Sequence, residues 1–214
     1  MPRRKIVLTN GEYYHIYNRS SFGLPIFGKR RETKLFLEAA AFYLQVKPAT
    51  KFSVYRKSRN EFPFTFNNRL VSIVNYCLMP NHFHFTLRQE SEKGISRFIQ
   101  RLTNSFSHYY GIKNQIQGHI FQDKFKAVHI EKDEQLLHLS RYIHLNPVTA
   151  NLVEKPEDYE FSSYNIYLGR ENSEVVLPKI VLDNFKGRGS YEKFVLSRKE
   201  YQRSLAKIKH LISE

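Results

Sequence analysis

Cysteine is nearly absent from this sequence, and so are long apolar runs. The single cysteine, Cys77, excludes an intramolecular disulfide and a cysteine-rich structural zinc site. No stretch approaches the ~20 apolar residues that a membrane span needs. The basic amino terminus, residues 1–5, lacks the apolar run of a signal peptide. We therefore expect a soluble, cytoplasmic protein with one buried, inert thiol and no membrane partner.

Acidic residues are also scarce relative to basic ones. The chain carries 34 Lys and Arg against 20 Asp and Glu, a formal net charge of +14, and the excess is spread along the sequence rather than confined to one tail. Such a balance favours a polyanionic partner, and nucleic acid is the commonest, because clustered cations gain affinity by releasing condensed counterions. The alternatives are a basic protein with a solvated surface or a ribosome-associated one.

Periodic apolar positions predict a small sheet with helices packed on it. Strands are expected at residues 12–18, 51–55, 70–78, 82–87 and 126–130, and a polar basic loop at residues 56–63. Helices are expected at residues 32–47 and 95–110, and from residue 132 or 133 to Pro147. The order of these elements predicts a ferredoxin-like α+β fold, an antiparallel sheet with helices on one face.

The chain is long enough for one domain and an appendage. We predict a catalytic core over residues 1–168 and a basic C-terminal extension over residues 169–214, with one or two helices between residues 191 and 212. Residues 159–164 are rich in aromatic side chains and are expected to pack back on the core as a clasp.

Two histidines separated by one bulky residue follow a predicted turn. In a strand, side chains alternate between faces, so His82 and His84 point one way while Phe83 and Phe85 point into the core. Two imidazoles at this spacing can hold one divalent metal ion. A single His-apolar-His triplet is more often an ordinary strand, so this pattern needs support from elsewhere in the chain.

That support comes from a predicted helix, in which Tyr142 and Asn146 lie four residues apart and therefore on one face. An amide oxygen with two imidazoles leaves metal positions open, as in catalytic sites. The metal would act as a Lewis acid on a phosphate, and Tyr142 as the nucleophile that forms a 5′-phosphotyrosine. Lys124 or Lys126 would activate the phenol. His144, two residues from Tyr142, points elsewhere and is expected to be structural.

The segments 78–84 and 142–153 together resemble the REP-associated tyrosine transposases, within the HUH-type single-tyrosine transposases. Residues 14–19, 118–125 and 161–164 are similar to further segments of that family, so the resemblance spans about residues 10 to 168. Asn151 stands where the family commonly has Gly, a change that Asn tolerates because it accepts left-handed backbone geometry. Phe121 and Phe161 stand at positions often filled by Trp.

The resemblance implies a ferredoxin-like fold, dependence on Mg²⁺ or Mn²⁺, and cleavage and joining of single-stranded DNA next to a hairpin. By the same resemblance, His82, His84 and Asn146 match the metal ligands and Tyr142 the nucleophile. No small-molecule cofactor is expected. The assembly is a monomer or a homodimer, since related enzymes include dimers, whereas a long C-terminal extension favours a monomer.

Basic side chains are the expected phosphate contacts. The main candidates are Arg19, Lys57, Arg97, Arg101, Lys124 and Lys126, with Arg56, Arg59, Lys186 and Arg188 as further ones. Two other functions stay open at this point. One is a nucleic-acid-binding regulator derived from such an enzyme, and the other is an unrelated metal-dependent hydrolase that uses water as its nucleophile.

Overall fold

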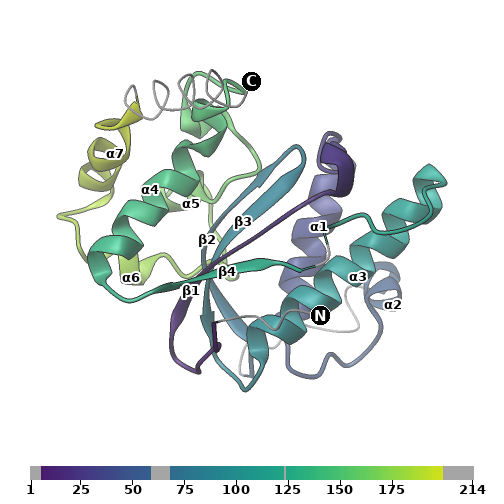
Figure 1. Ribbon diagram of the computed structural model, residues 1–214. Helices are drawn as coiled ribbons and strands as arrows, with labels where there is room; N and C mark the ends of the chain where they lie inside the picture. The colour runs from purple at the N-terminus through teal and green to yellow at the C-terminus, as the bar shows by residue number, and fades with distance from the viewer. Residues whose placement is uncertain (1–5, 59–67, 123, 200–214) are drawn as a thin grey trace.

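The computed structural model describes residues 6–58, 68–122 and 124–199. Four strands, β1 (Tyr13–Arg19), β2 (Val71–Met79), β3 (His82–Gln89) and β4 (Lys126–Ile130), form one sheet in the order β2-β3-β1-β4. Each neighbouring pair is antiparallel. With the helices packed on this sheet (Figure 1), the strand order confirms the predicted ferredoxin-like α+β fold.

Helices cover both faces of the sheet, not one face as predicted. Helices α1 (Arg30–Tyr43) and α3 (Gly94–Asn114) lie on one side, and α4 (Asp133–Thr149) lies on the other (Figure 1). Phe83 and Phe85 of β3 face the first layer, where they meet Phe36 of α1 and Phe98 of α3 at ring-centroid distances of 5.4 and 6.2 Å. Ile143 of α4 packs against Cys77 and Met79 on the other face.

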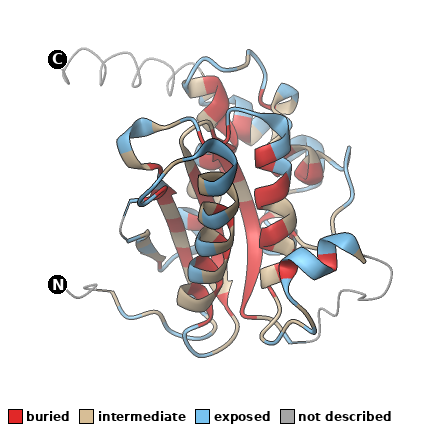
Figure 2. Ribbon diagram, turned by 90° about the vertical axis from the view of Figure 1, so that its right-hand side faces the viewer, coloured by how far each residue is buried: buried red, intermediate tan, exposed pale blue. Residues whose placement is uncertain are grey.

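Because both faces are covered, β2 and β3 are buried along most of their length (Figure 2). The structure differs from the prediction at residues 51–55, and it describes only part of the predicted loop at residues 56–63. The expected strand at residues 51–55 is instead the helix α2 (Phe52–Lys57), because Phe52 and Tyr55, three residues apart, both pack on Phe42 of α1. Most of the loop predicted at residues 56–63 lies outside the described residues, since residues 59–67 are not among them.

Helix α4 begins where the sequence predicts and ends later. Gln135 accepts hydrogen bonds from the backbone N–H of Lys132 through its side-chain oxygen, which fixes the first turn. Pro147 does not end the helix, which continues to Thr149, because a proline in the last turn removes only its own N–H while its carbonyl still accepts from Leu152 N. Asn151 follows at φ 54°, which confirms the left-handed conformation expected there.

The segment after α4 runs back along the free edge of β2. The predicted aromatic clasp is confirmed, since Phe161 O accepts from Leu78 N at 2.9 Å and the Tyr159 hydroxyl donates to Leu78 O at 2.7 Å. Four short helices belong to this part: the 3-10 helix η3 (Pro156–Asp158), α5 (Tyr164–Leu168), α6 (Lys179–Leu182) and α7 (Arg188–Leu196); a further 3-10 turn, η1 (Ser21–Gly23), follows β1.

Helix α7 packs against α4 and α5 and buries Tyr191 completely. Residues 200–214, where the end of the predicted C-terminal helices falls, lie outside the described residues, and the domain boundary at residue 169 stays a prediction. Among the described helices, none combines the length and apolarity that crossing a membrane requires.

Candidate active site

Strand register gathers polar side chains on the face of the sheet that α4 covers. In β1, Tyr17 lies opposite His84 of β3 and opposite Lys126 of β4. Two residues further along each strand, Arg19 lies opposite His82. Directly paired residues of antiparallel strands project to the same face, so these side chains form one surface beneath α4.

The two histidines of β3 are held in the same way, each through Nδ1. His82 Nδ1 lies 2.7 Å from the side-chain oxygen of Asn81, and His84 Nδ1 lies 2.9 Å from Nε2 of His15. Nε2 of His84 is buried and has no hydrogen-bond partner among the described residues. Since an amide oxygen only accepts, His82 Nδ1 carries the proton there, which leaves its Nε2 as a lone-pair donor.

Burial keeps these imidazoles neutral. It lowers the pKa of His15 and, together with the nearby Arg19 guanidinium, that of His82 to about 4. The pKa of His84 is lowered well below its ordinary value by burial and by its neighbours His15, His82 and Arg19. Neutral imidazole is the form that binds a metal ion, so at neutral pH the site presents nitrogen lone pairs rather than positive charges.

Helix α4 places Tyr142 over this pair of strands. Its ring centroid lies 5.8 Å from that of His84 and 6.4 Å from that of His15, edge-on in both cases. The residue is 42% exposed, so a substrate can approach it from solvent. Partial burial, with smaller contributions from Tyr17 and Cys77, raises the pKa of the phenol, which is therefore protonated at neutral pH.

Asn146 lies one helical turn beyond Tyr142 on the same face of α4. Its side-chain nitrogen is buried without a hydrogen-bond partner among the described residues. An unpaired buried polar group costs about 1–3 kcal/mol, so the free lone pair of His84 suits a bound cation, and the unpaired N–H donor of Asn146 suits an acceptor such as a phosphate oxygen.

The imidazole nitrogens fit a divalent metal ion, and an amide oxygen is a further donor of the kind that such an ion takes. His82 and His84 would supply Nε2 atoms, and Asn146 its side-chain oxygen. Within the described ranges, no three side chains of His, Cys, Asp or Glu gather as a metal site. His15 in particular meets the Nδ1 side of His84 and not its free nitrogen.

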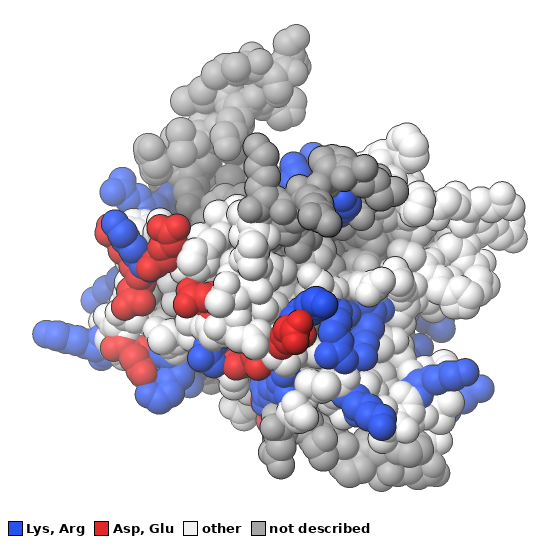
Figure 3. Space-filling model, turned by 60° about the horizontal axis from the view of Figure 1, so that its bottom comes forward, with Lys and Arg blue, Asp and Glu red and all other residues white. Residues whose placement is uncertain are grey.

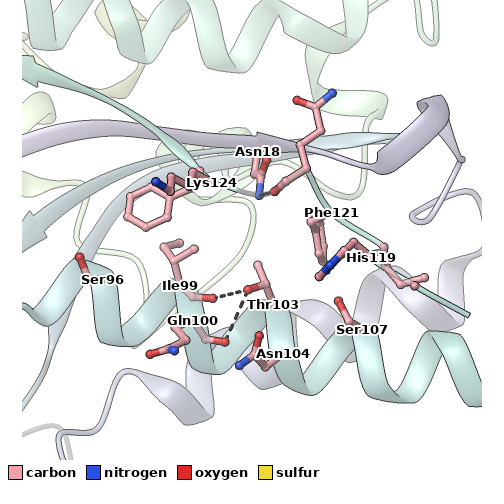
Figure 4. Close-up of a pocket in the computed structure, with 14 residues that line it drawn as sticks. Asn18, Ser96, Ile99, Gln100, Thr103, Asn104, Ser107, His119, Phe121 and Lys124 are labelled. Atoms are coloured by element: carbon pink, nitrogen blue, oxygen red, sulfur yellow. Dashed lines mark hydrogen bonds between the residues drawn. The ribbon is translucent and has the colours of Figure 1, made fainter. Parts of the chain in front are cut away.

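Two of the six predicted DNA contacts, Arg19 and Lys126, lie near this face. Arg19 is close enough to His82 to lower its pKa, and the Lys126 ammonium lies 5.9 Å from the ring centroid of Tyr17. Lys124 lines a separate groove of about 620 Å³ between α3 and the segment leading to β4, opposite the polar side chains of Gln100 and Asn104 (Figure 4). The groove also contains His119 and Phe121.

The other three lie in the helical layer on the far side of the sheet. Arg97 and Arg101 of α3 both donate hydrogen bonds to the backbone carbonyl of Val46, after α1, which gives them a structural task. Lys57 ends α2 in the same layer. Acidic and basic side chains are interspersed on the surface seen in Figure 3, so the net charge alone does not mark a DNA path there.

Sequence reasoning missed two residues of this face, His15 and Tyr17. Tyr17 stacks on His15 and His84 at ring-centroid distances of 4.9 and 5.8 Å. The available signal was the period-2 spacing of His15, Tyr17 and Arg19 in a predicted strand, which places all three on one face. That spacing does not say which strand lies beside them.

Two comparisons with known proteins bear on this site. Residues 50–146 match the family model described as "Transposase IS200 like". A solved structure of a REP-associated tyrosine transposase bound to a REP hairpin matches with a TM-score of 0.57 and 18% sequence identity, covering 87% of this chain and 96% of that one. The chain resembles the IS200-like transposases.

The resemblance drawn from the sequence motifs is thereby confirmed, and a transposase role is supported. At 18% identity, the solved relative establishes the shared fold. No curated protein matches the chain. The IS200-like match includes both histidines, Tyr142 and Asn146, whereas β1, which carries His15 and Tyr17, precedes it.

Proposed function

We propose that this protein is a metal-dependent endonuclease and strand transferase for single-stranded DNA, with Tyr142 as its nucleophile. The observation that carries the proposal is the free Nε2 of buried His84 on the face where Tyr142 lies. A buried nitrogen without a partner next to a solvent-accessible phenol provides a metal ligand and a nucleophile at one place.

In the proposed reaction, the Tyr142 phenolic oxygen attacks a backbone phosphorus. The O–P bond to tyrosine forms, the bond from phosphorus to the 3′-oxygen breaks, and the DNA 5′-phosphate stays on the protein. The phenol proton passes to solvent and the departing 3′-oxygen takes up a proton, so the step is balanced. Attack by a 3′-hydroxyl on the phosphotyrosine reverses these bond changes and joins strands without ATP.

His82, His84 and Asn146 would hold Mg²⁺ or Mn²⁺. When bound, the ion would withdraw charge from the phosphate oxygens and favour the developing negative charge of the transition state. The side chains have further tasks of their own. The histidine rings keep Tyr142 edge-on, and Arg19 and Lys126 add positive charge around the same face for the DNA backbone.

We propose DNA that carries a hairpin as the substrate class, since the solved relative was captured with a REP hairpin. Lys57, Arg97, Arg101 and Lys124 stay predicted DNA contacts, and Lys124 lines the groove that also contains Gln100 and Asn104. One chain supplies both His84 and Tyr142, so a site of this kind is available to a monomer.

The test is a denaturing-gel assay with labelled single-stranded hairpin DNA and Mn²⁺. Wild type is expected to form a slow-migrating covalent adduct, and Tyr142→Phe is expected to lose it while still binding DNA. Tyr17→Phe is the matched control, because it removes a second hydroxyl from the same face. An adduct lost in Tyr17→Phe and kept in Tyr142→Phe would move the nucleophile to β1.

Two further outcomes separate the alternatives. Cleavage that survives in Tyr142→Phe and releases a free 5′-phosphate would identify a hydrolase that uses water. Binding of hairpin DNA with neither cleavage nor adduct, over a pool of hairpins and with Mg²⁺ or Mn²⁺, would identify a regulator that only binds.

A further inference from the structure

His15 lies at the centre of the candidate site, although the proposed reaction gives it no task. Its ring is held on two sides, by the stacked Tyr17 ring and by the edge contact with Tyr142. Its Nε2 lies 2.9 Å from Nδ1 of His84, and the two rings are nearly parallel, at 18°. Such a nearly coplanar contact between ring nitrogens is a hydrogen bond in which one donates and the other accepts.

A metal ion bound at His84 Nε2 would decide which of the two ring nitrogens, His84 Nδ1 or His15 Nε2, donates the hydrogen bond. A neutral imidazole carries one proton, so a ring that offers the Nε2 lone pair carries its proton on Nδ1. Nδ1–H of His84 then donates to Nε2 of His15, which accepts. His82 is arranged in the same way, with Asn81 as its acceptor, so both candidate ligands have an acceptor at Nδ1.

We propose that His15 is a positioning residue for the metal site, which accepts the Nδ1 proton of His84 and so fixes the tautomer and the ring orientation that present Nε2. The inference rests on the proposed function. It assigns a task to a side chain of β1, a strand that precedes the residues matched by the IS200-like family model. Acceptors at the far nitrogen of ligating histidines orient the ring and raise its basicity, and their loss typically costs about 10–100-fold in metal affinity.

The geometry separates this role from that of a third ligand. A ligand nitrogen would face the same point as His84 Nε2, whereas His15 Nε2 faces the opposite ring nitrogen. A purely structural role is separable by experiment, because a residue that only fills space can be replaced by a ring of similar size.

The experiment measures Mn²⁺ affinity of the full chain by electron paramagnetic resonance titration. His15→Phe keeps a ring in place and removes the acceptor, and we expect affinity to fall about 10–100-fold. His15→Gln places a side-chain oxygen near the lost Nε2 and is expected to restore part of the affinity. His129→Phe is the control, since His129 lies on the opposite face of β4, bonded to Glu12, and its replacement should leave affinity unchanged.

A second readout reports the tautomer itself. With ¹⁵N-histidine labelling and Mg²⁺, long-range ¹H–¹⁵N spectra of wild type should show His84 protonated on Nδ1, and His15→Phe should lose this single state. Mn²⁺ affinity in folded His15→Phe equal to wild type, with an unchanged His84 tautomer, would overturn the positioning role and leave the proposed function intact. Absence of Mn²⁺ binding by wild type would overturn the metal site and the inference together.

Discussion

Two buried histidines differ in one respect: His84 faces the Tyr142 ring from the sheet, and His144 follows Tyr142 by two residues on α4. His84, on the sheet, is 5% exposed, and its Nε2 has no partner among the described residues. His144, on α4, is fully buried, and both of its nitrogens are bonded, Nδ1 to the Tyr191 hydroxyl at 2.7 Å and Nε2 to the Ser163 hydroxyl at 2.9 Å. Burial lowers the pKa of both, that of His144 to about 3.

Burial and a lowered pKa therefore do not distinguish a candidate ligand from a structural histidine in this protein. A structural polar network perturbs pKa values as strongly as a catalytic site does. Hydrogen-bond pairing does distinguish them, because a residue selected only for stability has no physical reason to keep a buried nitrogen unpaired. The prediction that His144 is structural is confirmed by its two bonds.

The largest expected difference between the two histidines comes from replacing each of them, His84 and His144, by leucine. His84→Leu should abolish Mn²⁺ binding and reduce adduct formation at least about 100-fold, because it removes a metal ligand. His144→Leu should lower the free energy of unfolding by about 2–4 kcal/mol, because the buried Tyr191 and Ser163 hydroxyls each lose one hydrogen bond and the packing around the ring is disturbed. Isothermal titration with Mn²⁺ and urea denaturation of metal-free protein measure the two effects.

In the metal-free protein, His84→Leu should cost less stability than His144→Leu, since removing an unpaired buried nitrogen offsets part of the lost packing. If the two variants show the same stability loss and the same loss of Mn²⁺ binding, pairing does not separate the two histidines, and the assignment of His84 as a ligand fails.

The sequence predicts those parts of the site that depend on residues close together in the chain, and not those that depend on contacts between distant segments. Alternation along a strand put His82 and His84 on one face, and helical spacing put Asn146 beside Tyr142, because both rules act over a few residues. His15 and Tyr17 joined the site only through the strand order β2-β3-β1-β4, which is set by packing between distant segments.

The same distinction accounts for the basic side chains. Arg19 and Lys126 lie near the site because β1 occupies the centre of the sheet between β3 and β4. Arg101 looks like an exposed cation on an amphipathic helix, yet it donates to the carbonyls of Gln45 and Val46, more than fifty residues away in sequence. Composition gives the number of cations, and only tertiary structure gives their positions.

The next prediction concerns how the stability of the protein depends on pH, and it follows from the buried, neutral His144. Its folded pKa of about 3 lies below the unfolded value of 6.5, so the unfolded chain binds more protons between these values and stability falls as pH falls through this window. His15 and His82 act in the same direction down to about pH 4. Between pH 6.5 and the folded pKa, His144 alone lowers the free energy of unfolding by about 1.4 kcal/mol for each unit that the pH falls.

Leucine at position 144 cannot be protonated, so the stability gap between wild type and His144→Leu should narrow by roughly 2.5 kcal/mol between pH 7 and pH 4.5. Urea titrations of both proteins at the two pH values measure the gap. A gap that stays constant would mean that His144 titrates in the folded protein as it does in the unfolded chain.

The smallest expected effect tests whether the two histidine environments are independent. Tyr191 of α7 contacts His144 and donates to the Ser140 hydroxyl at 3.2 Å, so Tyr191→Phe should cost about 1–2 kcal/mol of stability by urea denaturation. Mn²⁺ affinity should stay within about twofold of wild type, because His84 is bonded through β1 and not through α4. A parallel fall in affinity would show instead that α7 sets the position of α4, and through it Asn146, so that the C-terminal helices belong to the working core.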